Sequence, residues 1–198
     1  MNQHILNADA RFIPLKDESI QTVVTSPPYW GLRKYAAPEL TWGGNDQCQH
    51  VWLDFLRSGI SGGTASQKVQ IKGQDNFQIV PPQQQGTCSL CGAWRGQLGL
   101  EPTPELYVSH IVEIFREVRR VLRRDGTVWL NLGSSYAASS LAHPNFKPKD
   151  LVPIPWLVAL ALQNAGWYLR SDIIWQKGNC MPESVRDRPT RAHEYLFM

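Results

Sequence analysis

The stretch from 103 to 124, TPELYVSHIVEIFREVRRVLRR, most limits the folds open to this chain. Its apolar side chains recur at the spacing of one helical face, Thr103 can cap the first turn, and Pro104 suits the first helical position. Its many arginines are typical of a solvated helix face. An Asp-Gly pair ends the pattern, and TVWLNLG at 127–133 follows with the composition of a buried strand. A long helix followed at once by such a strand indicates a sheet with helices packed on it.

The same alternation of strands and helices is expected elsewhere. The further elements are a short strand at 5–6, a strand at 20–25, a helix that starts at Pro155 and ends at Gly166, and strands at 167–176 and 193–198. This order indicates a parallel α/β sheet with short crossovers, and ligands of such sheets bind beyond the carboxyl ends of the strands. We therefore expect Asp9, the residues after Thr25 and the segment 131–136 to lie at that edge.

Composition sets wide limits. The 198 residues suit one domain with a small appendage, and a hydrophobic content of 42% with eight tryptophans can support a core. A net charge of +3 permits nucleic-acid binding but does not argue for it. No apolar run approaches the length of a membrane span, and the N-terminal residues lack the pattern of a signal peptide, so we expect a cytoplasmic protein.

The strand at 20–25 runs directly into a Ser-Pro-Pro-Tyr corner. The prolines fix φ and remove N–H donors, which makes the turn rigid. The carbonyl of Pro27 and the hydroxyl of Ser26 can accept both hydrogens of an amine on a planar ring, while Tyr29 stacks on the ring. Such hydrogen bonds favour a pyramidal nitrogen whose lone pair can attack a methyl group, and a base must leave the duplex to reach the corner. The alternative is a turn that only ends a strand.

The stretch TSPPYW resembles the catalytic motif of the amino-methylating DNA methyltransferases of prokaryotes and phages. These enzymes modify cytosine N4 or adenine N6 with S-adenosylmethionine. The resemblance extends over 7–35, 98–136 and 181–198 and so covers most of the chain. It implies a Rossmann-like methyltransferase sheet, double-stranded DNA as the partner, and a place in restriction-modification or a similar methylation system.

The resemblance also implies roles for single residues. The catalytic corner is Ser26, Pro27, Pro28 and Tyr29, while Asp9 occupies the position that contacts the adenine of the cofactor, with Ser26 beside it. Ser rather than Asp at the first motif position favours cytosine N4, and adenine N6 is the alternative. Related corners act on protein glutamine or on RNA, so other amine substrates stay open.

The family also carries a glycine-rich loop that approaches the methionine part of the cofactor, and no such run occurs here. We therefore expect the N-terminal portion of an enzyme, with an incomplete methyltransferase sheet and an incomplete cofactor pocket. A second polypeptide would then complete the site. The alternative from another class is a non-catalytic half that binds DNA or a partner chain.

Contacts to the substrate are expected close to the corner and on a late loop. Trp30 and Arg33 directly follow the corner. A proline-containing loop near the C-terminus offers three further cations for phosphate contacts, which are Arg186, Arg188 and Arg191. His193 and Glu194, by contrast, are interpreted as packing or hydrogen-bonding groups and not as an acid–base pair.

Two short motifs predict a structural zinc site. Cys48 and His50 form a C-x-H pair, and Cys88 and Cys91 form a C-x-x-C turn that a glycine follows. Four such ligands suit tetrahedral zinc and leave no open position for catalysis. The alternative is three unrelated thiols and a surface histidine.

The segment between the two ligand pairs has a different composition. Residues 57–87 are rich in Gly, Ser and Gln and poor in apolar side chains, which predicts a mobile surface loop. We therefore expect a zinc-binding insertion at 45–91 within a catalytic domain formed by 1–44 and 92–198.

Overall fold

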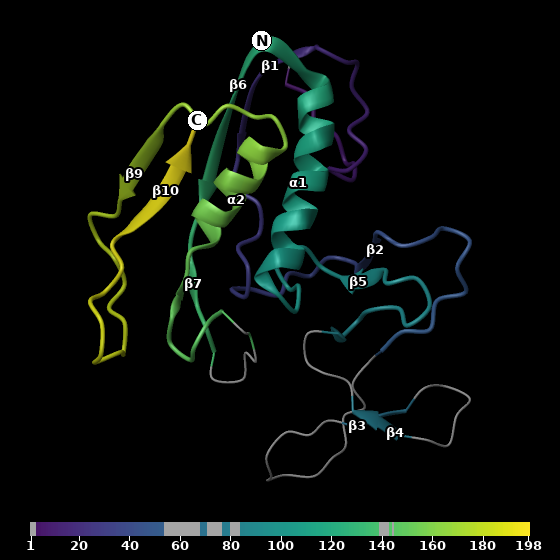
Figure 1. The fold of residues 1–198 in the computed structure, drawn as a ribbon. Helices are drawn as coiled ribbons and strands as arrows, with labels where there is room; N and C mark the ends of the chain where they lie inside the picture. The colour runs from purple at the N-terminus through teal and green to yellow at the C-terminus, as the bar shows by residue number, and fades with distance from the viewer. Residues whose placement is uncertain (1–2, 54–67, 71–76, 80–83, 139–142, 144) are drawn as a thin grey trace. The chain divides into compact units, whose positions relative to one another are not determined.

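The computed structural model describes residues 3–53, 68–70, 77–79, 84–138, 143 and 145–198 (Figure 1). The chain divides into two compact units, which are described separately below. The first comprises Met1–Tyr29, Val108–Ser135 and Leu151–Met198, and the second comprises Trp30–Tyr107 and Tyr136–Asp150. The predicted mobile loop at 57–87 lies largely outside the described residues.

The first unit is built on a four-stranded sheet in the order β1-β6-β10-β9. The strands are β1 (Ile20–Thr25), β6 (Leu122–Leu132), β9 (Asp172–Gln176) and β10 (His193–Phe197). β1 runs parallel to β6, whereas β10 runs antiparallel to both β6 and β9. The α/β class is confirmed, but the expectation of a fully parallel sheet is wrong. The described chain between β9 and β10 contains no helix. Parallel neighbours need a long and usually helical crossover, so β10 pairs antiparallel with β9.

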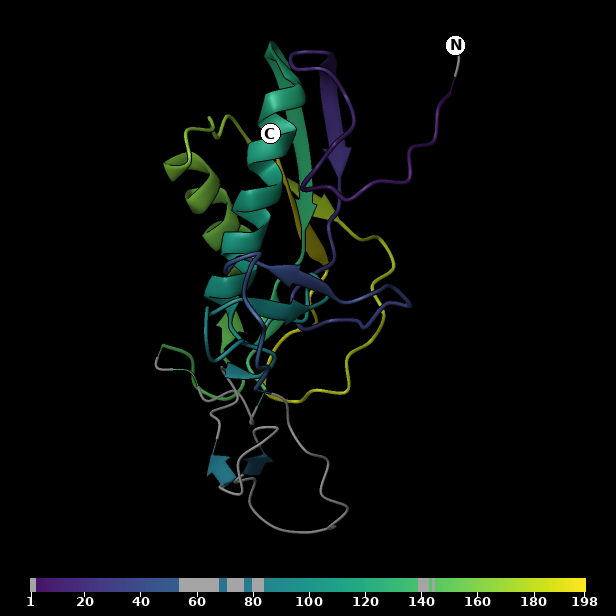
Figure 2. The ribbon, with the colours of Figure 1, turned by 90° about the vertical axis from the view of Figure 1, so that its right-hand side faces the viewer.

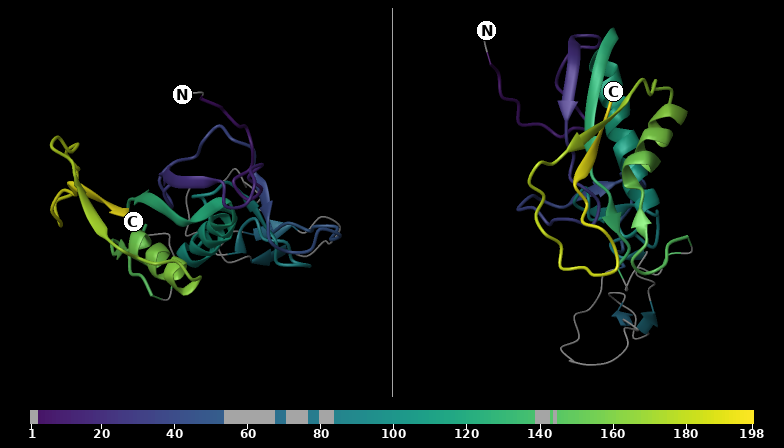
Figure 3. Two further views of the ribbon diagram at one scale, coloured as in Figure 1. Left: turned by 90° about the horizontal axis from the view of Figure 1, so that it is seen from above. Right: turned by 90° about the vertical axis from the view of Figure 1, so that its left-hand side faces the viewer.

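Both helices lie on the same face of this sheet. They are α1 (Pro104–Val121), most of which belongs to the first unit, and α2 (Ile154–Asn164), and the views in Figures 1, 2 and 3 agree on their placement. Ile111 and Phe115 of α1 are fully buried, as is Val158 of α2. The rings of Tyr195 and Phe197 on β10 meet Trp156 edge-on, with centroids 5.5 and 5.3 Å apart.

The opposite face of the sheet is open in the described chain. Strand alternation places Val24, Trp129, Leu196 and Trp175 there, one from each of the four strands. Val24 is 76% exposed and Trp175 is 57% exposed. The sheet therefore presents an apolar surface with two tryptophans next to the corner that follows β1.

The junction between α1 and β6 differs from the prediction. The helix ends at Val121 and not at residue 124, because the main chain before β1 binds its last carbonyls. The amide of Ser19 donates to the carbonyl of Val121 at 2.9 Å. Leu122 then pairs with Ile20, so β6 begins five residues earlier than the predicted strand at 127–133.

The other predicted elements have mixed outcomes. The strand at 20–25 and the strand from 193 are confirmed, as is α2, whose end is followed by Gly166 with φ +92°. The strand predicted at 167–176 is shorter and begins at Asp172. The strand predicted at 5–6 is wrong, because no described strand pairs with this segment and Ile5 is 98% exposed.

An arginine of α1 binds the segment that leads into β1. The guanidinium of Arg120 binds Glu117 at 2.6 Å and Asp17 at 2.5 Å, and it donates to the carbonyls of Ile13 and Leu15 at 2.8 and 3.0 Å. This side chain, expected on a solvated helix face, therefore holds the segment 13–17 against the helix.

The second unit contains short strands. β2 (Leu40–Trp42) pairs antiparallel with β5 (Trp94–Gly96), and β3 (Lys68–Gln70) pairs antiparallel with β4 (Phe77–Ile79). The remaining strands are β7 (Ser135–Tyr136) and β8 (Leu151–Val152), the latter in the first unit. The predicted boundaries of the insertion, 45 and 91, fall inside the second unit and stay a prediction. Among the described residues, no helix is long and apolar enough to cross a membrane.

Candidate functional site

The Ser-Pro-Pro-Tyr corner lies at the carboxyl end of β1. Thr25, the last residue of the strand, pairs with Leu130 of the parallel strand β6. The next residue of each strand, Ser26 and Asn131, therefore reaches the same edge of the sheet. Ser26 is exposed and Tyr29 is half-buried. A ligand that arrives from solvent can therefore reach both side chains.

A glycine at the end of β6 makes room for the ring of Tyr29. A Cβ atom added at Gly133 would lie 2.7 Å from Cε2 of Tyr29 and 2.8 Å from Cδ2. These distances are far below a normal van der Waals contact, so the ring can pack against this stretch of backbone only because the residue has no side chain. Gly133 thus contributes to the position of the Tyr29 ring.

A network of polar side chains surrounds the Tyr29 hydroxyl. The hydroxyl lies 2.5 Å from Oδ1 of Asn131 and 2.9 Å from Oε2 of Glu194. Oγ of Ser26 lies 3.3 Å from the Tyr29 hydroxyl and 3.4 Å from Oδ1 of Asn131. The ammonium of Lys177 donates to Oε1 of Glu194. Residues from the corner, β6, β10 and the end of β9 thus meet at one point.

Glu194 is an ionised member of this network. Burial alone would raise the pKa of its carboxyl, but hydrogen bonds from Lys177, Tyr29 and Asn131 and the charge of Lys177 together lower the pKa below its ordinary value. The side chain is only 21% exposed. A negative charge therefore sits next to the Tyr29 hydroxyl at neutral pH.

The network opens into a cleft on the open face of the sheet, with a volume of about 640 Å³. The lining side chains come from the corner and from the strands of the open face, and they are Val24, Thr25, Ser26, Trp129, Asn131, Trp175, Glu194 and Leu196. A cleft with apolar walls and a few convergent polar groups is the usual form of a small-molecule site.

Asp9, the predicted cofactor contact, is half-buried and bound to Arg11. Both carboxylate oxygens accept from this arginine, the shortest contact being 2.7 Å from the guanidinium, and the backbone amide of Arg11 donates at 2.9 Å. Hydrogen bonds to the Arg11 side chain lower the pKa of Asp9, so the carboxylate is ionised. Its contact with the adenine of a cofactor stays a prediction.

The residues predicted to contact substrate lie in varied environments. Trp30 belongs to the second unit and is buried there, with its indole N–H donating to the carbonyl of Glu101 at 2.9 Å. Arg33 is exposed. Contact of either residue with DNA stays a prediction.

Of the late arginines, Arg186 is exposed, while Arg188 forms an ion pair with Glu183. The guanidinium of Arg191 lies over the ring of Tyr195, 5.8 Å from its centroid. Their phosphate contacts also stay a prediction.

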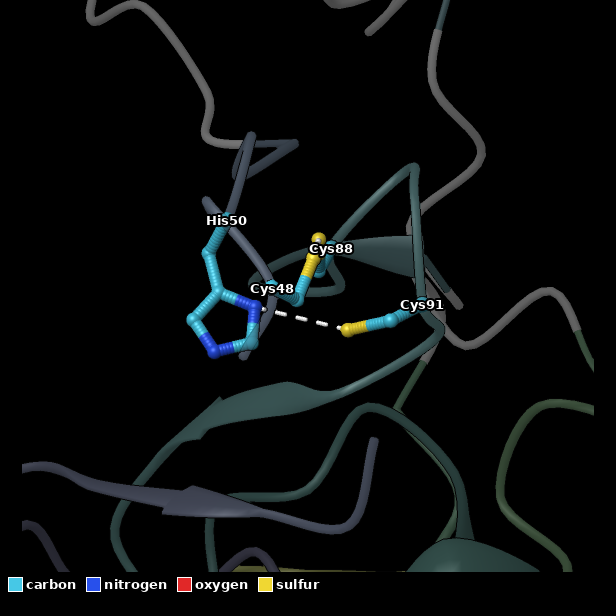
Figure 4. A group of neighbouring side chains, drawn as sticks. All are labelled: Cys48, His50, Cys88 and Cys91. Atoms are coloured by element: carbon cyan, nitrogen blue, oxygen red, sulfur yellow. Dashed lines mark hydrogen bonds between the residues drawn. The ribbon is translucent and has the colours of Figure 1, made fainter. Parts of the chain in front are cut away.

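The four predicted metal ligands gather in the second unit (Figure 4). The ligand atoms of Cys48, His50, Cys88 and Cys91 all lie within 4.8 Å of one another. Sγ of Cys48 is 3.9 Å from Sγ of Cys88, and Sγ of Cys91 is 3.4 Å from Nδ1 of His50. All four cysteines of the chain are free thiols, so no disulfide competes for this cluster.

Backbone hydrogen bonds hold the two ligand pairs together. The amide of Cys88 donates to the carbonyl of Ala93 at 2.7 Å, and the amide of Gly92 donates to the carbonyl of Cys88 at 3.0 Å, which closes the C-x-x-C turn. The amide of Ser89 donates to the carbonyl of Val51 at 2.9 Å and ties this turn to the first ligand pair. The cluster is thus built from neighbouring backbone segments, although its pairs are far apart in the chain.

The thiols of the cluster differ in pKa. Burial tends to raise the pKa of Cys88, but amide N–H groups of Leu90, Cys91 and Val51 and the His50 ring lower it to about 6. Burial and the neighbouring thiols raise the pKa of Cys48 to about 12. At least one thiolate is therefore present near neutral pH, and thiolates are the form that binds metals.

Comparison with known proteins identifies the family. Residues 20–198 match the family model N6_N4_Mtase, described as DNA methylase. The chain is 38% identical to the type II methyltransferase M.SmaI of Serratia marcescens, over 93% of this chain and 50% of that protein. It is also 36% identical to M.XycI of Xanthomonas campestris pv. cyanopsidis and 34% identical to M.Cfr9I of Citrobacter freundii, in each case over 93% of this chain and 49% of the relative.

The α/β sheet has a cleft at the ends of its strands, and these matches define the class of the protein. The chain belongs to the DNA methylase family. It spans about half the length of the curated relatives it matches.

The sequence contains only weak signals, or none, that three residues of the network belong to the site. Asn131 lies in the segment 131–136 that was expected at the ligand edge, and Glu194 was interpreted correctly as a hydrogen-bonding group. Lys177 follows the predicted strand at 167–176 and is part of no recognisable sequence motif. Only the pairing of β9 with β10 brings it to Glu194.

The contact between Gly133 and Tyr29 gives a direct prediction. If the complete protein methylates DNA as its relatives are named to do, Gly133→Ala should lower that rate by about 10- to 100-fold, because a displaced ring misaligns the site. Gly178→Ala is the matched control, since an added Cβ there meets nothing within 4 Å. Methylation at the wild-type rate by Gly133→Ala would show that the position of the ring does not matter.

Proposed function

We propose that this protein transfers a methyl group from S-adenosylmethionine to the exocyclic amine of a base in double-stranded DNA, with cytosine N4 as the preferred target. The observation that carries the proposal is that Ser26 lines the cleft at the carboxyl ends of two parallel strands, with the Tyr29 hydroxyl hydrogen-bonded to it. The similarity to type II methyltransferases supports DNA as the substrate.

The corner would hold a base that has left the duplex. Ser26 and the carbonyl of Pro27 would accept the two amine hydrogens, and Tyr29 would stack on the ring. The lone pair of the amine then attacks the methyl carbon, so a nitrogen–carbon bond forms as the sulfur–carbon bond of the donor breaks. The amine, which is positively charged after transfer, releases one proton to water at the mouth of the cleft.

The cofactor site proposed here is completed by sequence other than residues 1–198. Asp9 and Ser26 would contribute cofactor contacts, while the glycine-rich run of the family has no counterpart in these residues. A chain that covers about half of each relative supports this arrangement. The completing segment would come from the same gene product or from a second polypeptide, and residues 1–198 alone would then be a non-catalytic half.

Arginines after β9 are proposed to position the duplex. Arg186 is exposed, and Arg188 and Arg191 lie on the same loop. Contacts from such side chains to phosphates orient DNA without reading its sequence. Trp30 and Arg33 directly follow the corner and are proposed as further substrate contacts.

Nucleoside analysis tests the proposed function. DNA from cells that express the complete protein should contain N4-methylcytosine by mass spectrometry, and Ser26→Ala should reduce it by about 100-fold, the usual cost of losing one polar group that stabilises a transition state. Ser19→Ala is the control, because its hydroxyl binds Lys16 at the other end of β1.

N6-methyladenine in place of N4-methylcytosine would establish the alternative target. An undiminished level of methylation with Ser26→Ala would overturn the role of the corner, and no methylated base in the wild type would overturn the proposed function.

We also propose that the Cys48–His50–Cys88–Cys91 cluster binds one structural zinc ion. Tetrahedral zinc with bonds of about 2.3 Å to sulfur holds two sulfurs about 3.8 Å apart. The observed separation of Cys48 and Cys88 is 3.9 Å. Zinc would close the base of the proposed insertion at 45–91, and its four protein ligands would leave no position for substrate.

Metal analysis tests the zinc site. Protein purified under reducing conditions should contain about one zinc ion per chain, and a chelator should lower its melting temperature, since structural zinc stabilises the fold. A Cys88→Ser/Cys91→Ser double variant should lose the metal, while Cys180→Ser should retain it because Cys180 lies outside the cluster. Wild-type protein without zinc would refute the proposal.

A further inference from the structure

The Tyr29 hydroxyl has more acceptors in reach than hydrogens to donate. The Tyr29 hydroxyl carries one hydrogen, yet it has two acceptors in reach, Asn131 at 2.5 Å and Glu194 at 2.9 Å. The amide of Asn131 donates at 3.3 Å to the carbonyl of Tyr195, which keeps Oδ1 turned toward Tyr29. The ammonium of Lys177 and the amide of Asn131 also donate to Glu194. Ser26 carries the second hydroxyl hydrogen of the network.

The charge of Glu194 decides how these hydrogens are shared. An ionised carboxylate is an acceptor only, and hydrogen bonds to a charged acceptor are about twice as strong as those between neutral groups. Lys177 binds the other carboxylate oxygen and keeps Glu194 in place. The hydrogen of Tyr29 is therefore held on the side of Glu194 and Asn131, and the oxygen of Tyr29 is left with a lone pair toward Ser26.

This asymmetry fixes the direction of the Ser26 hydroxyl. Its oxygen lies 3.3 Å from the Tyr29 oxygen and 3.4 Å from Oδ1 of Asn131, and both of these atoms then accept. The Ser26 hydrogen points inward to one of them. The lone pairs of Ser26 point outward into the cleft, where the side chain is exposed.

We propose that Glu194 is a positioning residue that orients a relay of two hydroxyls, Tyr29 and Ser26, so that Ser26 meets the target amine as a hydrogen-bond acceptor. This inference rests on the proposed function. Without the negative end of the relay, the Ser26 hydroxyl is free to turn its hydrogen outward, where it opposes the hydrogens of the amine. Glu194 thus acts on the reacting nitrogen through two other side chains, without touching it.

The relay also explains why Glu194 and Lys177 form an ion pair at this edge. The side chain of Glu194 is 21% exposed and that of Lys177 is 43% exposed. An ion pair at such a position contributes little to stability by itself. Its value lies in keeping the carboxylate charged and directed at Tyr29.

Single-turnover kinetics of the complete protein test the inference. Glu194→Gln keeps the shape but removes the charge, and it should slow methyl transfer by about 10- to 100-fold, the range for losing a hydrogen bond to a charged group. Binding of the DNA site and KM should change little, because the proposed role of Glu194 is exerted through Tyr29 and Ser26. Glu194→Asp, which restores the charge, should recover part of the rate.

Two further variants separate the relay from a general structural effect. Tyr29→Phe keeps the ring and breaks the relay, so its loss should not add to that of Glu194→Gln in the double variant. Glu18→Gln removes an equal charge from an ion pair with Arg124 before β1, and it should leave the rate unchanged. If Glu194→Gln fails to fold, the rates of Tyr29→Phe and Glu194→Asp decide the question.

The outcomes distinguish this inference from the proposed function. Absence of methylation by the wild-type protein would remove the proposed function itself. Wild-type activity with an unimpaired Glu194→Gln or Tyr29→Phe variant would overturn the relay alone. A loss confined to DNA binding, or losses that add fully in the double variant, would also overturn it.

Discussion

Parallel pairing of β1 with β6 is the interaction on which the site depends. The register that joins Thr25 to Leu130 brings Ser26 and Asn131 to one edge, and it turns both toward the face that the helices leave open. A slip of one residue would turn every side chain of β1 to the other face. Asn131 would then no longer face the corner, and Tyr29 would lose its nearest polar partner. The helices contribute by covering the opposite face, where Ile111, Phe115 and Val158 are fully buried.

Local features of the sequence predicted the elements that form the corner. The run IQTVVT is rich in β-branched residues and two prolines follow it closely, so β1 was predicted with the bounds that the structure has. The gathering of Cys88 and Cys91 could be anticipated for a similar reason, because a C-x-x-C turn places two thiols together whatever surrounds it. The α/β class followed from the alternation of helices and strands, and membership of the DNA methylase family confirms the resemblance based on the corner and its neighbours.

Features that depend on distant contacts were not predictable in this way. Tyr29 and Glu194 are 165 positions apart, and their contact depends on β10 running antiparallel beside β6. The sequence pattern indicated a parallel strand there, which would have placed Glu194 differently. The end of α1 was also missed, since the groups that bind its last carbonyls come from the segment before β1. Lys177 carries no motif, and its role follows only from the pairing of β9 with β10.

In the proposed function, Tyr29 lies against the ring of a base that the corner holds. Photocrosslinking tests it most directly, with a duplex that carries 5-iodocytosine at the methylated position and the complete protein bound to it. We expect the crosslinked peptide to map to Tyr29, and moving the iodocytosine to a neighbouring position should abolish the product. Crosslinks that map only outside residues 26–29 would contradict this placement of the base.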